Sequence, residues 1–192
     1  MADNQSPELF GQTPWQTVGP FFHFALPTLE DLTAGAAPGP RIEIIGTVFD
    51  ADGAPVPDAL VEIWQAGAAG RYDSAADDRG IALDPGFRGF GRAATDADGG
   101  FRFITVPPGR GPGPGNSLQA PHIAVGVFGR GLLKRLCTRL YFEDGAGNEE
   151  DPILALVPPE RRSTLIARRV GEARYRFDIH LQGEHETVFF DV

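Results

Sequence analysis

The stretch "RIEIIGTVFDADGAPVPDALVEIWQA", residues 41–66, decides the fold class. Its two ends are rich in β-branched and apolar residues, and its middle holds "DADG" and two prolines. This pattern predicts two β-strands, at about 41–49 and 59–65, joined by a turn-rich loop. The first elements of the chain are therefore strands of a sheet.

The same pattern recurs along the rest of the chain. Further strands are predicted at about 101–106, 122–128, 136–142, 175–181 and 187–190. Only residues 158–169, "PPERRSTLIARR", suggest a helix, with prolines at its start. We therefore expect an all-β fold, a sandwich of two antiparallel sheets with long loops and one short helix.

The chain of 192 residues is long enough for one domain with a substantial core, and its 25 glycines and 17 prolines indicate many turns. Residues 41–192 are predicted to form the β-sandwich domain. Residues 1–40 precede it as an N-terminal arm whose segment "TPWQTVGPFFHFALP" is unusually aromatic. From the residues alone, this arm either folds back on its own domain or lies across another subunit, and we expect it to pack on a partner subunit.

The charge balance limits the classes of partner. The net charge of −9, with acidic residues spread over the loops, disfavours nucleic acid and anionic membranes. No secretory leader and no apolar run of membrane-spanning length is found, so we expect a soluble, cytoplasmic protein. Cys137 is the single cysteine, which excludes an intrachain disulfide.

Several groups of residues resemble functional motifs at first sight. The glycine-rich "GRGPGPG" at 109–115 lacks the Lys-Ser/Thr and the helix of a phosphate loop. His180 and His185 are unfavourable zinc ligands, because one lies in an alternating strand and the other in its turn. His122 begins a predicted strand, where a second metal ligand would be expected two residues later; that position is Ala124.

The segments "WQAGAAGRYD", "GFRGFGRAATDADGGFRF", "PHIAVGVFGRG", "TRLYFED" and "YRFDIHLQGEHETVFFD" together resemble the intradiol ring-cleaving dioxygenases over essentially the whole chain. The resemblance implies a mononuclear Fe(III) site built from two tyrosines and two histidines. Tyr72 and His122 match the first ligand of each type. The second tyrosine falls on Gly111 and the second histidine on Ala124, while an arginine of catalytic members is replaced by Gln119.

Two ligands of four cannot satisfy ferric iron, and the missing phenolate removes charge that stabilises the 3+ state. We therefore expect no metal site and no catalytic residue in this chain alone. The resemblance implies a heteromer in which a homologous beta chain binds Fe(III), and alpha–beta protomers form a larger oligomer. It further implies aromatic compound catabolism, with protocatechuate cleaved by O2 to 3-carboxy-cis,cis-muconate.

In such a heteromer, the resemblance assigns this chain part of the substrate pocket: Thr17, Gly19 and Pro20 from "TVGP", and Arg130 from "GRG". The alternatives are a solvated turn for Arg130, and a turn leading into an aromatic cluster for residues 17–20. Two other functions stay open at this point. One is a self-sufficient enzyme that takes further ligands from His180 or His185, and the other is a non-enzymatic β-sandwich that binds a protein or ligand.

Overall fold

The computed structural model describes residues 26–33, 39–115 and 117–191. The strands in this part are β1 (Ile42–Phe49), β2 (Leu60–Gln65), β3 (Phe90–Ala94), β4 (Gly100–Thr105), β5 (His122–Phe128), β6 (Leu136–Phe142), β7 (Ile166–Gly171), β8 (Arg174–Arg176) and β9 (Ile179–His180). Three 3₁₀ helices stand between β6 and β7: η2 (Asn148–Glu150), η3 (Leu154–Leu156) and η4 (Pro159–Leu165). The all-β prediction is confirmed.

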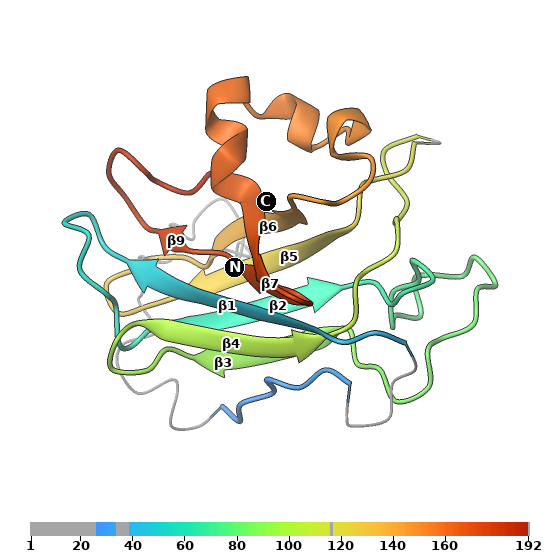
Figure 1. The fold of residues 1–192 in the computed structure, drawn as a ribbon, viewed down its shortest axis with the longest axis horizontal. Helices are drawn as coiled ribbons and strands as arrows, with labels where there is room; N and C mark the ends of the chain where they lie inside the picture. Colours follow the sequence, from blue (N-terminus) through green and yellow to red (C-terminus); the bar gives the residue numbers. More distant parts are fainter. Residues whose placement is uncertain (1–25, 34–38, 116, 192) are drawn as a thin grey trace, which may run out of the picture.

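The strands form two layers that are joined at one edge (Figure 1). One layer has the order β3-β2-β5-β6 and is antiparallel, and the other has the order β7-β8-β1-β4. The link between them is a short parallel pairing in which Tyr141 and Phe142 of β6 lie beside Ile166 and Ala167 of β7. The hydrogen-bonded path thus passes from one layer to the other without a break.

The core lies between the two layers because apolar residues alternate along the strands. In β1 every second residue is buried, including Ile42, Ile44 and Val48. These side chains pack in the same cluster as Phe103 of β4 and Ile123 of β5. A second, smaller cluster lies beneath the 3₁₀ helices and contains Ala120, Tyr141, Leu154, Val157 and Leu165. The candidate site lies beside this second cluster.

The structure corrects several details of the predicted elements. Residues 166–171 form strand β7, and only residues 159–165 are helical, as a 3₁₀ helix. β3 was not predicted, and the segment predicted at 175–181 is divided into β8 and β9. Residues 187–190 form no strand and contribute only an isolated bridge between Phe190 and Cys137. The β1–β8, β1–β9 and β6–β7 pairs are parallel, so the sheets are not purely antiparallel.

The described end of the predicted arm packs on this chain's own sandwich. Leu29 bridges to Arg92 of β3, and the Leu32 backbone N–H donates to the Ile104 carbonyl at 2.9 Å. The Leu32 side chain is fully buried. Residues 1–25 lie outside the described part of the chain, so the prediction that the arm contacts a partner stays a prediction. None of the helices in the described ranges is long and apolar enough to cross a membrane.

Candidate functional site

The fold brings Tyr72 and His122 together, although they are 50 positions apart in the sequence. Tyr72 lies in the loop after β2, and His122 is the first residue of β5. The tyrosine Oη lies 3.4 Å from the histidine Nε2. Both side chains are thus placed as two matched ligands of an iron site would be.

Hydrogen bonds fix the orientation of the His122 ring. Its Nδ1 lies 2.8 Å from the Ala120 carbonyl, so Nδ1 carries the proton and Nε2 has a free lone pair. That lone pair accepts from the Tyr72 hydroxyl, and Nη1 of Arg139 also lies 3.5 Å away. Burial is the main cause that lowers the pKa of His122, and the nearby Arg139 charge lowers it further. The imidazole is therefore neutral at physiological pH.

The Tyr72 phenol is held in its protonated form. Burial raises its pKa, because the phenolate would lose hydration. Its ring stacks on Trp64 with centroids 5.9 Å apart, and its backbone N–H donates to Asp77 at 2.9 Å. Arg79, through a hydrogen bond and an ion pair, holds the pKa of the Asp77 carboxyl well below its usual range. This network fixes the loop that carries the tyrosine.

The two unmatched positions also lie at this site. A Cβ added at Gly111 would lie 3.4 Å from the Tyr72 ring, at ordinary contact distance. Close backbone packing places it there, because a Cβ at Gly70 would lie 2.2 Å from the Arg110 carbonyl oxygen. Ala124 shares a face of β5 with His122 and pairs in register with Arg139 of β6. Gly111 thus lies beside Tyr72, and Ala124 lies on the side of β5 that carries His122.

Arg139, which no sequence motif indicated, reaches His122 from β6. Its Nη1 donates to the Gln119 side-chain oxygen as well as approaching His122. The Arg139 guanidinium thus links Gln119 and His122. A charged residue inside the apolar strand "LCTRLYF" was the available signal.

These residues do not fit ferric iron. The donors present are one neutral phenol and one imidazole whose Nε2 is already hydrogen-bonded. A guanidinium cation reaches the same atom and would repel a 3+ ion. Within residues 26–33, 39–115 and 117–191, no three His, Cys, Asp or Glu side chains are grouped to hold a metal. No step of a reaction can be assigned to iron in this chain.

Gln119 and Asp151 fix the backbone around the site. Two hydrogen bonds restrain Gln119. Its backbone N–H donates to the Gly111 carbonyl at 2.9 Å, and its side-chain amide donates to the Pro112 carbonyl. Asp151 is fully buried and accepts from the Ala120 N–H at 2.7 Å and from the Tyr141 hydroxyl at 3.0 Å. Sequence reasoning missed Asp151, for which only the local "EEDP" gave a turn signal.

Arg130 lies far from this cluster. It follows β5 at the end opposite His122, two residues beyond a strand that spans about 20 Å at a rise of ~3.3 Å per residue. Its Nη2 forms an ion pair with Asp58 at 2.9 Å, and its side chain is 64% exposed. The other residues expected at the substrate, Thr17, Gly19 and Pro20, lie outside the described residues. Arg130 is therefore available to a neighbouring molecule and does not serve the Tyr72–His122 site.

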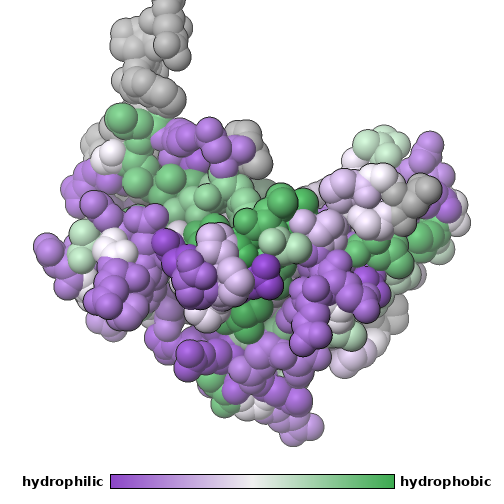
Figure 2. Space-filling view, turned by 90° about the horizontal axis from the view of Figure 1, so that it is seen from above, coloured by the Kyte–Doolittle hydropathy of each residue, from purple (hydrophilic) through white to green (hydrophobic). Residues whose placement is uncertain are grey.

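A hollow of about 600 Å³ lies over the outer face of β2, β5 and β6 beside Ala124 and Arg139. Trp64, Ile153 and Phe190 contribute to its walls. Figure 2 shows the molecule from above. Hydrophilic residues cover much of this face, and hydrophobic residues gather in the middle of the face. The side chain of Leu156, on the edge of the 600 Å³ hollow, is 76% exposed. Such apolar surface is typical of sites that contact a ligand or another protein.

Comparison with known proteins gives the class to which this fold and site belong. A family model described as "Dioxygenase" matches residues 19–183. In structure, the chain is similar to the dioxygenase domain of a dioxygenase–carbohydrate-binding protein fusion from Streptomyces sp. SirexAA-E, with 30% identity and a TM-score of 0.62. That match covers 90% of this chain and 99% of the other. The chain belongs to this family, the intradiol dioxygenases, which are oxidoreductases that use non-haem Fe(III).

Particular relatives are more similar in sequence. The chain is 43% identical to the protocatechuate 3,4-dioxygenase alpha chain of Burkholderia cepacia, over 94% of this chain and 98% of that relative. It is 39% identical to the protocatechuate 3,4-dioxygenase beta chain of the same organism, over 90% of this chain and 76% of that relative. The similarity thus extends over nearly the full length of the alpha chain.

Proposed function

We propose that this chain is the alpha subunit of a protocatechuate 3,4-dioxygenase and that it works with a homologous beta subunit. The observation that carries the proposal is the arrangement around His122, in which Arg139, Ala124 and Gly111 replace what an iron site needs. The full-length similarity to an alpha chain supports it. The chain retains the family's fold and lacks its metal centre.

In this proposal the beta subunit binds the Fe(III), which activates the catechol ring toward O2. The ring bond between the two hydroxylated carbons is cleaved, both oxygen atoms enter the product, and the product is 3-carboxy-cis,cis-muconate. The residues of this chain supply binding and orientation and exclude water from a pocket shared with the partner. They transfer no electrons.

Arg130 is the described residue best suited to bind the substrate. Protocatechuate is an anion, and a guanidinium can donate paired, charge-assisted hydrogen bonds to its carboxylate. Arg130 is exposed, and among the residues that the structure describes its one acidic partner is Asp58, so its guanidinium can reach a ligand at a subunit boundary. Thr17, Gly19 and Pro20 would complete this wall of the pocket. We place the assembled enzyme in the cytoplasm.

The test is to prepare the chain alone and together with a paralogue that has both tyrosines and both histidines. The chain prepared without the paralogue should be colourless and free of iron. The co-expressed preparation should contain a heteromer with iron, the visible absorption of ferric tyrosinate, and O2 uptake with protocatechuate. Iron-dependent ring cleavage by the chain alone would contradict the proposal, and so would full activity of the paralogue without this chain.

A further inference from the structure

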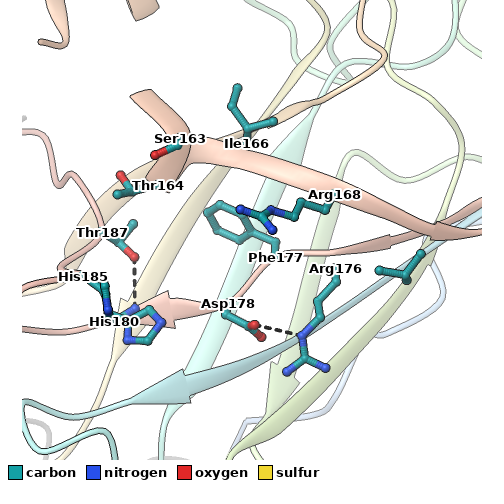
Figure 3. A pocket seen from close by; sticks show the side chains of 11 residues that line it. Ser163, Thr164, Ile166, Arg168, Arg176, Phe177, Asp178, His180, His185 and Thr187 are labelled. Carbon is teal, nitrogen blue, oxygen red and sulfur yellow. Dashed lines mark hydrogen bonds and ion pairs between the residues drawn. The ribbon is translucent and has the colours of Figure 1, made fainter. Parts of the chain in front are cut away.

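A second hollow, of about 530 Å³, lies on the outer face of the other layer (Figure 3). Its lining comes from η4, β7, β8 and the segment that follows β8. The residues are Ser163, Thr164, Ile166, Arg168, Val170, Arg176, Phe177, Asp178, His180, His185 and Thr187. It shares no residue with the Tyr72–His122 site or with Arg130.

Strand alternation directs two arginines to the same side of this layer. Arg168 and Arg176 are direct partners in the antiparallel pairing of β7 with β8. Like charges directly opposite each other destabilise a sheet. In a chain with a net charge of −9, this placement of two cations is not explained by an excess of basic residues.

The charges in the hollow do not balance internally. Arg176 donates to Asp178 Oδ2 at 2.8 Å, while Asp178 Oδ1 accepts from the Thr47 backbone N–H at 3.0 Å. Among the described residues of the lining, Asp178 is the single carboxylate. The guanidinium of Arg168 has no hydrogen bond or ion pair to any residue in the described part of the chain. In Figure 3 it points into the middle of the hollow. One cation thus remains uncompensated.

Two imidazoles and a hydroxyl add donors at the other side of the hollow. The rings of His180 and His185 meet edge to face with centroids 6.0 Å apart, and the His180 ring stacks on Phe49 at 4.9 Å. The Ser163 hydroxyl lies at the rim. Arginine, imidazole and hydroxyl groups that converge on one space are suited to bind oxygen anions.

We propose that this hollow binds a small organic anion that carries two or more carboxylates. Arg168 would bind one carboxylate and the His180–His185 side another. Ile166 and Val170 of β7 form an apolar part of the lining, and the buried Phe177 ring lies at the floor of the hollow. An apolar wall of this kind favours a ligand with a carbon frame over inorganic phosphate. The inference is independent of the proposed function.

Isothermal titration with citrate, succinate and inorganic phosphate tests the site, on the chain alone and on the assembled heteromer. We expect citrate to bind more tightly than phosphate. Arg168→Gln should weaken citrate binding at least fivefold, because the uncompensated cation is lost. Arg169→Gln is the matched control: it changes the next residue of the same strand, whose guanidinium pairs with Asp144 outside the hollow.

Three results would overturn the proposal: no citrate binding at millimolar concentration in either preparation, equal weakening by both variants, or tighter binding of phosphate than of citrate. Citrate-dependent protection of Arg168 in hydrogen-exchange or chemical-modification experiments would support it even if a variant folds poorly. Ring cleavage is measured separately on the same heteromer. A failure of ligand binding at the hollow therefore leaves the dioxygenase assignment intact, and the reverse also holds.

Discussion

At the scale of single residues, Arg139 decides the chemistry of the Tyr72–His122 pair. A phenol and an imidazole at 3.4 Å could begin a ferric site, but the guanidinium at 3.5 Å from Nε2 supplies positive charge at that position. Ala124 is the register partner of Arg139 across β5 and β6, so the position without a ligand and the cation lie side by side in the sheet.

Restoring the missing ligands should not be sufficient to restore iron binding. We expect Gly111→Tyr with Ala124→His to bind little Fe(III) while Arg139 is present, because the cation competes for the same space. Adding Arg139→Gln should raise the iron content severalfold and produce visible ferric-tyrosinate absorption. Arg135→Gln is the control, because Arg135 lines the 600 Å³ hollow together with Arg139, and it should not raise the iron content. Equal iron content with and without Arg139 would show that the guanidinium is irrelevant.

Arg130 should affect one substrate selectively. In the heteromer, Arg130→Ala should raise KM for protocatechuate roughly tenfold, which corresponds to the loss of one charge-assisted interaction of about 1.4 kcal/mol. KM for catechol, which has no carboxylate, should change little. Equal kinetics for the wild type and the variant on both substrates would remove Arg130 from the pocket.

The ion pair of Arg130 with Asp58 competes with the substrate carboxylate for the guanidinium. We expect Asp58→Asn to lower KM for protocatechuate a few fold, because the guanidinium then leaves no ion pair with Asp58 when it binds the substrate. Steady-state O2 uptake measures the change. Asp52→Asn removes an exposed acid in the β1–β2 loop and is the control. A rise in KM in Asp58→Asn would mean that Asp58 orients Arg130 productively.

The buried imidazole makes stability depend on pH. Because the folded pKa of His122 is lowered, its contribution is fully present above the ordinary value of about 6.5 and is lost as the pH falls through the folded pKa. The unfolded chain then binds a proton that the folded chain does not. Between pH 7.5 and 5.0, the free energy of unfolding of His122→Asn, measured with denaturant, should fall less than that of the wild type. His185→Asn, on the surface, should behave like the wild type.

At the scale of secondary-structure elements, the alternation of apolar and polar residues determined which strands the sequence could predict. β1, β4, β5 and β6 alternate or run apolar and lie close to their predicted bounds. The helix predicted at 158–169, from prolines at its start and Leu165 and Ile166 in positions to pack, overlaps the first part of β7, whose pairing with β6 and β8 is a tertiary effect. β3 contains two small residues and a glycine, so its pairing with β2 has little local signal.

The candidate site shows the same division between local and tertiary information. His122 and Ala124 were placed correctly by strand periodicity, since both lie in β5 with side chains on one face. The approach of Tyr72, Gly111 and Arg139 depends on three separate segments of chain, and family resemblance supplied the first two only. A pattern in one sequence does not show which long side chain lies beside a position that lacks its ligand.

One carboxylate, that of Asp151, holds the start of η3. Asp151 accepts from the N–H groups of Ile153 and Leu154, near the start of η3, and from the Ala120 N–H before β5. Asp151→Ala should lower the free energy of unfolding by about 3 kcal/mol, because several buried donors lose their acceptor. Chemical denaturation measures this loss. Glu149→Ala, exposed in η2, should change stability by less than about 0.5 kcal/mol.

At the scale of the whole molecule, the sandwich and the N-terminal arm should be separable. Residues 29–33 already bridge to the sandwich and bury Leu32, so a chain that begins at residue 26 keeps these contacts. We expect this truncation to shift Tm little and to weaken pairing with the beta subunit and substrate binding, since Thr17, Gly19 and Pro20 are removed. Size-exclusion chromatography and KM for protocatechuate are the readouts. Unchanged assembly and KM would confine the functional surface to residues 26–192.

The pairing of β1 has a consequence for synthesis of the chain. One edge of β1 is completed by β8 and β9, and the Thr47 N–H donates to Asp178, 131 positions later. On the ribosome, β1 therefore emerges long before its final neighbours exist, and its edge stays open until nearly the whole chain has left the exit tunnel. Folding must be largely post-translational. A truncated nascent chain exposes an apolar strand edge, which makes timely completion or chaperone binding a requirement for a good yield.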